Sequence, residues 1–188
     1  MKKLSDEILW KSLKEGNLTA FEALFKNYYT SLFNYGLKIS GNKTITEDSL
    51  QDFFMYVYEH RENLSDLNSI APYLFTSYRR FLIKILQKNQ KNKFIRNINE
   101  NIVDIHFTPE ELLTSQESTS FRNKNLSVSL NKLPKKQREV LYLKYNCELK
   151  TQEIADVMGI NYQSVVNYIH KAIKRLREDI QILQLFNS

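Results

Sequence analysis

The last long helical segment of the sequence carries side chains suited to nucleic-acid contact. Residues 161–177 include no acidic residue, and amide and phenol groups near the start give way to lysines and arginines. In a helix that enters the major groove of DNA, leading polar side chains reach base edges and later cations meet phosphates. We assign to this outer face Tyr162, Gln163, Ser164, Val166, Asn167, His170, Lys171, Lys174 and Arg175.

An alternative for this segment is a basic, solvated helix that finishes an ordinary bundle. Its terminal lysines and arginines would then only complement the helix dipole. His170 has an ordinary surface role as a further alternative to phosphate contact. We favour DNA contact because a turn, an inward apolar pattern and the charge asymmetry all agree.

A second pattern is an acidic helix face around Asp52. Carboxylates and an amide around an exposed methionine can pair basic residues of a partner protein about an apolar centre. A solvated helix start would explain Glu47 and Asp48 equally well, whereas Asp52 and Met55 lie deeper in the helix. A two-carboxylate metal site is disfavoured, because no histidine or further carboxylate stands at ligand spacing. The face comprises Glu47, Asp48, Gln51, Asp52, Met55 and Tyr56.

A third pattern combines cations with aromatic rings. Between residues 66 and 100 there is no acidic residue, while lysines, arginines, tyrosines and phenylalanines alternate. This composition is typical of single-strand binding, because cations follow phosphates and exposed rings stack on bases. Spacing favours Tyr78 and Phe81 as core residues and leaves Tyr73 and Phe75 as stacking candidates. The preceding loop, residues 63–70, carries three polar side chains: Asn63, Asn68 and Ser69.

Helices must position all three patterns. Apolar residues at helical spacing follow Thr19, Thr44 and Pro72, and the two threonines form predicted capping boxes with Glu22 and Glu47. No alternating strand pattern is present, so the expected fold class is all-α. We expect two small helical domains joined by a flexible linker, the C-terminal one a helix-turn-helix.

The expected boundaries are residues 1–93 for the first domain, 94–125 for the linker and 126–188 for the second domain. The linker stretch is polar and rich in Ser, Thr and Asn, without a sustained apolar stripe. In the second domain a short helix begins near Thr151. Gly159 suits a turn with positive φ, and Asn161 is a good N-cap for the long helix that follows.

Composition agrees with a protein that meets polyanions. The 188 residues include 27 Lys plus Arg against 21 Asp plus Glu, a formal net charge of +6, and the pI is about 9.2. Cys147 is the one cysteine, so no intramolecular disulfide can form. We find no targeting segment or membrane span and expect a cytoplasmic protein without direct membrane insertion. No cofactor, metal or catalysis is expected, because His60, His106 and His170 are scattered.

Two groups of segments resemble one known family. LNKLPKKQREVLYLKY followed by TQEIADVMGINYQSVVNYIHKAIKRLR resembles the promoter-reading C-terminal domain of the extracytoplasmic-function (ECF) sigma factors of bacterial RNA polymerase, in the sigma-70 family. AFEALFKNYYTSLFNYG, TEDSLQDFFMYVYEHRENL and PYLFTSYRRFLIKIL resemble, in order, helices of the N-terminal domain of that family. The sequence is therefore identified as a member of the ECF group on both halves.

The resemblance implies roles for the three patterns. The second domain would read the distal promoter element as duplex DNA, and the linker would thread the RNA channel of the polymerase. An anti-sigma factor is implied as a further partner, beside core RNA polymerase and promoter DNA, and no small-molecule substrate. Polymerase docking would fall to Asp48, Gln51, Asp52, Met55 and Tyr56. Promoter melting and single-strand binding would fall to Asn63, Asn68, Ser69, Tyr73, Phe75, Arg79, Arg80 and Lys84.

Two positions depart from the family pattern. Val166 stands where family members often carry a basic residue, which removes a charged contact and alters the expected promoter preference. Arg79 and Arg80 stand where arginine followed by asparagine is usual, so extra backbone contact is expected there.

Two other functions compete with the sigma factor hypothesis. A stand-alone helix-turn-helix transcription regulator would bind duplex DNA tightly without polymerase, whereas a sigma factor alone would bind it weakly. A nucleic-acid enzyme subunit would need Asp48 and Asp52 to hold metal, and activity that survives their replacement by alanine would remove it.

Overall fold

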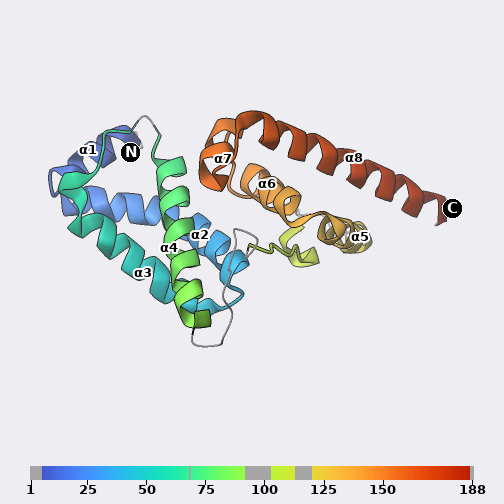
Figure 1. The fold of residues 1–188 in the computed structure, drawn as a ribbon, viewed down its shortest axis with the longest axis horizontal. Coiled ribbons are helices and arrows are strands. Elements are labelled where there is room, and N and C mark those ends of the chain that lie inside the picture. Colours follow the sequence, from blue (N-terminus) through green and yellow to red (C-terminus); the bar gives the residue numbers. More distant parts are fainter. Residues whose placement is uncertain (1–5, 68, 92–102, 113–119, 187–188) are drawn as a thin grey trace. The chain divides into compact units, whose positions relative to one another are not determined.

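The computed structural model describes residues 6–67, 69–91, 103–112 and 120–186, and every regular element in these ranges is a helix (Figure 1). The all-α fold class is therefore confirmed. The chain divides into two compact units, one built on α1–α4 and the other beginning at Val103. In chain order the elements are α1 (Asp6–Lys14), α2 (Leu18–Ser40), α3 (Lys43–Glu59), η1 (Arg61–Asn63), α4 (Ile70–Lys91), η3 (Pro109–Leu112), α5 (Ser120–Lys132), α6 (Lys135–Tyr145), α7 (Thr151–Met158) and α8 (Tyr162–Phe186).

The first unit packs α2 against α1, α3 and α4. Its core is unusually rich in aromatic side chains: Phe53 of α3 lies 5.4 Å from the Tyr78 ring of α4, measured between ring centroids. Buried aromatic pairs add specific geometry to the burial of apolar area. Tyr78 is fully buried, as its spacing predicted, and Phe81 is half-buried against Phe53.

Tyr78 also makes a polar contact inside this core. Its hydroxyl lies 3.2 Å from the hydroxyl of Ser49 on α3. Burial raises the pKa of Tyr78 to about 12, so the phenol stays protonated and can donate. A buried hydroxyl without a partner would cost free energy, and this contact satisfies it.

The helix starts differ from the predicted capping boxes. The side-chain oxygen of Asn17 accepts from the Ala20 N–H at 3.1 Å and caps α2. That of Asn42 accepts from the Ile45 N–H at 3.0 Å and caps α3. Thr19 and Thr44 therefore lie inside their helices, and both predicted caps were placed two residues too late. Asparagine is at least as good an N-cap as threonine, so the helix extends to it.

The second unit packs α8 against α5 and α6. Val140, Leu143, Ile154, Val165 and Ala172 are fully buried in it. These side chains recur at helical spacing in three different helices, which is the pattern of a small helical core.

An extended segment, residues 103–107, belongs to this second unit. Val103, Ile105 and Phe107 are buried in alternation. The Asn131 side chain accepts from the Phe107 N–H and donates to its carbonyl oxygen, both at 2.9 Å. This segment lies within the range that we predicted as linker, residues 94–125, and α5 (Ser120–Lys132) begins within that range. The segment packs because its period of two, over five residues, buries three apolar side chains.

Candidate functional site

The outward face of α3 is built as the helical spacing predicted. Asp48, Gln51 and Asp52 are exposed, and on the opposite side the helix buries Ser49, Leu50, Phe53, Phe54 and Val57. Met55 is 53% exposed and Tyr56 is 49% exposed, so two large apolar groups stand in water among carboxylates. Such a patch, apolar at its centre and acidic around it, suits a protein partner with a basic surface.

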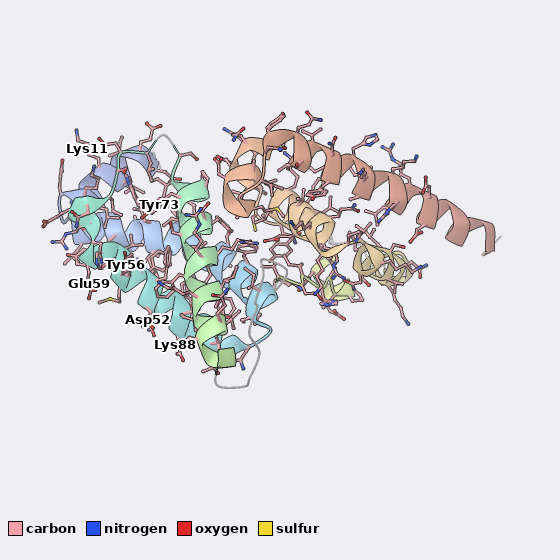
Figure 2. The ribbon with its side chains drawn as sticks, viewed as in Figure 1. Lys11, Asp52, Tyr56, Glu59, Tyr73 and Lys88 are labelled. Carbon is pink, nitrogen blue, oxygen red and sulfur yellow. The ribbon has the colours of Figure 1, made fainter. Side chains whose placement is uncertain are left out.

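The end of this face is shaped by Tyr56 and His60. Their rings stack with centroids 4.0 Å apart and an interplanar angle of 28°. His60 Nδ1 also lies 2.9 Å from the Tyr56 carbonyl oxygen. Glu59, one turn beyond Tyr56, is also exposed. Figure 2 labels Asp52, Tyr56 and Glu59 in succession along α3. Glu47, in contrast, pairs with Lys43 at 3.7 Å, which supports the reading of Glu47 as part of a solvated helix start.

A basic stripe runs along α4. Arg80 and Lys84 are exposed, as is Lys88 one turn further on (Figure 2). The three cations are four residues apart, so they share one side of the helix and could follow a phosphate backbone. Arg79 is 8% exposed, because it shares the buried stripe of Phe75 and Leu82. The prediction that Arg79 faces nucleic acid is wrong because this side chain is buried, whereas Arg80 is exposed and stays a candidate.

The two aromatic stacking candidates on α4, Phe75 and Tyr73, differ in burial. Phe75 is 1% exposed and its ring packs against Tyr35 with centroids 5.6 Å apart. The prediction that Phe75 stacks on bases is therefore wrong, because its ring fills the core between α2 and α4. Tyr73 is half-buried and lies edge-on to Trp10 at 5.2 Å. Tyr73 stays the stacking candidate of this helix, and partial burial raises the pKa of its hydroxyl.

The loop before α4 presents polar side chains to solvent. Asn63 is exposed at the end of η1, where its backbone N–H donates to the His60 carbonyl oxygen at 3.0 Å. Ser69 is exposed at the foot of α4, and Asn68 lies outside the described residues. Two contacts hold the middle of the loop: the Trp10 indole N–H donates to the Ser65 carbonyl oxygen, and Lys14 pairs with Asp66.

The helix-turn-helix is confirmed at α7 and α8. Gly159 has φ +63°, and the Ile160 N–H donates to the Ala155 carbonyl oxygen at 3.0 Å, which ends α7 with a left-handed cap. The Asn161 side chain accepts from the Ser164 N–H at 2.7 Å and caps α8, as predicted. The turn therefore fixes where the outer face of α8 begins.

That outer face is exposed almost throughout. Val165 and Ala172 are buried on the opposite side, so the predicted inward pattern holds. The Gln163 amide donates to the Asn167 side-chain oxygen at 3.2 Å, which orients two base-reading candidates together. The predicted duplex contacts that are exposed are Tyr162, Gln163, Asn167, His170, Lys171, Lys174 and Arg175, and those that are half-buried are Ser164 and Val166.

Comparison with known proteins shows which proteins this chain is similar to. Residues 124–176 match the family model described as sigma-70, region 4. The chain is 25% identical over 182 residues to the ECF RNA polymerase sigma factor SigW of Bacillus subtilis, covering 92% of this chain and 95% of that protein. It is 25% identical over 162 residues to the ECF RNA polymerase sigma factor SigL of Mycobacterium tuberculosis, covering 86% of this chain and 89% of SigL. The chain is therefore similar to ECF sigma factors over most of its length.

Solved structures share the fold of this chain. CnrH, solved in complex with the cytosolic domain of CnrY, matches with a TM-score of 0.63 and 19% identity, over 94% of this chain and 97% of CnrH. The Bartonella quintana sigma factor RpoE, solved with the anti-sigma factor NepR, matches with a TM-score of 0.59 and 18% identity, over 86% of this chain and 97% of that chain.

One residue of these surfaces, Glu59, was missed from the sequence. It lies seven residues after Asp52 and extends the α3 face already identified. The helical period would have found it, had the face been followed to the end of the helix. Within the described ranges no helix is long and apolar enough to cross a membrane.

Proposed function

We propose that this protein is an ECF sigma factor, which binds core RNA polymerase and directs it to promoters, where it takes part in recognition, DNA melting and transcription initiation. The observation that carries the proposal is the exposed face of α3, where Met55 and Tyr56 stand in water between carboxylates. A protein that bound only DNA would have no use for such a face. The related SigW and SigL are named as RNA polymerase sigma factors, and their similarity covers both units of this chain.

Polymerase docking rests on Asp48, Gln51, Asp52, Met55 and Tyr56. The two carboxylates steer a basic partner surface, and Met55 and Tyr56 supply apolar area at the centre of the contact. Because the opposite side of α3 is buried in the core, this face is held rigidly and binding costs little ordering entropy.

Promoter melting rests on α4 and the loop before it. Arg80 and Lys84 follow the phosphates of the separated strand, and Tyr73 supplies an aromatic surface for a base. Asn63 and Ser69 are the described loop side chains that could bond an extruded base. The residues stand where single-stranded DNA could pass along one helix.

Duplex recognition rests on α8. Gln163 and Asn167 face base edges, and Lys171, Lys174 and Arg175 meet phosphates. We place the protein in the cytoplasm with its polymerase and assign it no catalysis of its own. By analogy with the solved complex of RpoE and the anti-sigma factor NepR, an anti-sigma factor is an expected partner.

Run-off transcription with bacterial core polymerase and a library of promoter fragments tests this function. The protein should give promoter-dependent transcripts with polymerase and bind the same duplexes weakly by itself. Nanomolar duplex binding by the protein alone, without any gain of promoter selectivity by polymerase, would establish the stand-alone regulator instead.

A further inference from the structure

Helix α1 reaches the loop before α4 through the side chain of Trp10. Trp10 is 2% exposed, and its indole N–H donates to the carbonyl oxygen of Ser65 at 3.0 Å. A buried indole N–H requires an acceptor, whereas a loop carbonyl in solvent could be satisfied by water. The bond therefore fixes the loop backbone at Ser65, fifty-five residues further along the chain.

One turn later on α1, Lys14 holds the next residue of the loop. Its ammonium group donates to the carboxylate of Asp66. This hydrogen bond and the charge of Lys14 lower the pKa of Asp66, so the carboxylate is ionised and the pair is formed at neutral pH. The Asp66 side chain is exposed and the pair is screened by salt, so Trp10 is the stronger of the two anchors.

The same tryptophan contacts α4 beyond the loop. The rings of Trp10 and Tyr73 meet edge to face with centroids 5.2 Å apart. Tyr73 is the aromatic candidate for contact with separated DNA (Figure 2). Trp10 thus fixes the loop and the ring of Tyr73 relative to each other, although it lies in a helix that carries none of the predicted DNA contacts.

We propose that α1 is a positioning element for base capture: Trp10 and Lys14 hold the described loop residues, 63–67 and 69, and Tyr73 in the geometry that accepts an extruded promoter base. The inference rests on the proposed function, because a captured base is a step of promoter melting. Trp10 and Lys14 touch no DNA in this mechanism. They act by reducing the number of loop conformations, and preorganisation of this kind raises discrimination between bases.

Other α1 side chains account for the packing of the helix itself. Leu9 and Leu13 are buried in the first unit. Trp10→Phe removes the N–H together with part of the buried indole, so its unfolding midpoint is measured beside loop exchange to separate loss of the bond from loss of core packing. Asp66→Asn provides a second variant, since it weakens the Lys14 pair without changing α1 at all. Glu7→Gln, an exposed carboxylate on the same helix, is the matched control.

Amide hydrogen exchange of residues 64–70 gives the first readout and needs no polymerase. Loss of one anchoring hydrogen bond should raise loop exchange in Trp10→Phe by roughly fivefold, with α2 amides unchanged. Asp66→Asn should raise it less, and Glu7→Gln should match wild type. Equal loop exchange in wild type and in both loop variants would overturn the proposal.

Transcription from promoters that differ at single positions of the melted element gives the second readout. The variants should discriminate less between bases at the melted element. Their transcription from a template with a preformed bubble of the preferred sequence should fall by a smaller factor than their discrimination does. An equal loss of transcription from both templates would indicate a variant that is only destabilised, and it would contradict the positioning role. If wild type itself directs no promoter-dependent transcription, the proposed function fails, and the exchange readout still decides whether α1 orders the loop.

Discussion

Gly36 of α2 lies directly against Tyr78 of α4: a Cβ added at Gly36 would stand 2.3 Å from the Tyr78 hydroxyl oxygen and 2.8 Å from a ring carbon. Glycine is required here by space, since its φ is not in the left-handed region. The contact brings α2 and α4 together at the centre of the first unit. It also places the Tyr78 hydroxyl beside Ser49 of α3, so one residue joins three helices.

Gly36→Ala should therefore destabilise the first unit. The added methyl group meets a fully buried ring that cannot move away, and overpacking of this kind costs about 1–3 kcal/mol in the free energy of unfolding. Urea denaturation followed by far-UV circular dichroism measures it. Asn34→Ala, at an exposed position of the same helix, is the control, and an unchanged midpoint in Gly36→Ala would refute the close contact.

Replacement of Phe75 by alanine should mainly lower stability, whereas replacement of Tyr73 by alanine should mainly weaken promoter opening. Phe75→Ala removes a core ring and should lower the free energy of unfolding by about 3–5 kcal/mol. Tyr73→Ala should cost less stability but weaken promoter opening, because one stacked base contributes about 1–3 kcal/mol. Permanganate reactivity of promoter thymines reports opening, and Tyr73→Phe should restore it. Normal opening in Tyr73→Ala would remove Tyr73 from the DNA contacts.

Asp104 should make the second unit sensitive to acid. Burial raises its pKa, but a hydrogen bond from Lys135 at 2.9 Å and the charges of Arg138, Lys135 and His106 outweigh burial, so the pKa is lowered below the ordinary 3.8. A lowered pKa means that the stabilisation is complete above the unfolded value and is lost as the pH falls through the folded value.

Asp104→Asn tests this linkage. At neutral pH it should cost about 1–2 kcal/mol, between the values for exposed and buried ion pairs, because Arg138 is left buried without its carboxylate. The difference from wild type should shrink below about pH 4, where the wild-type carboxyl group is itself protonated. Thermal unfolding across this range provides the measurement, with Glu110→Gln as an exposed control. A difference that is independent of pH would contradict the assignment.

Gln163 and Lys174 should affect DNA binding in different ways. Gln163→Ala removes a base-edge contact and should relax the preference at one promoter position, a loss of about 1–3 kcal/mol in discrimination. Lys174→Ala should weaken binding to all promoters alike and reduce the salt slope of log K by about 1. Competition binding by the polymerase complex at several salt concentrations separates the two. The same profile for both variants would mean that Gln163 and Lys174 do not differ as base contact and phosphate contact.

Surfaces on long helices could be predicted from the sequence because the helical period fixes the outward side. The faces of α3 and α8 were located in this way, with the turn at Gly159 and the cap at Asn161. Phe75 was misjudged because its ring packs against Tyr35 of α2, a contact that no local pattern reveals. The role of α1 was not predictable either, since Trp10 meets its acceptor across fifty-five residues.

The predicted linker shows a different limit. Residues 103–107 alternate buried and outward side chains, but five residues are too few to distinguish this period from chance in a polar stretch. Their fixation depends on the Asn131 amide and on the Arg138 pair with Asp104, both contributed by helices further along the chain. The domain boundaries at residues 93, 125 and 126 stay a prediction.

The central claim, that the α3 face docks polymerase, is tested most directly by Asp52→Arg in promoter-dependent run-off transcription. Glu22→Arg, the same charge change at an exposed position of α2, is the control. We expect Asp52→Arg to lose transcription and core polymerase binding while its duplex binding and unfolding midpoint stay at wild-type values, and Glu22→Arg to transcribe normally. Full transcription by Asp52→Arg would contradict the account.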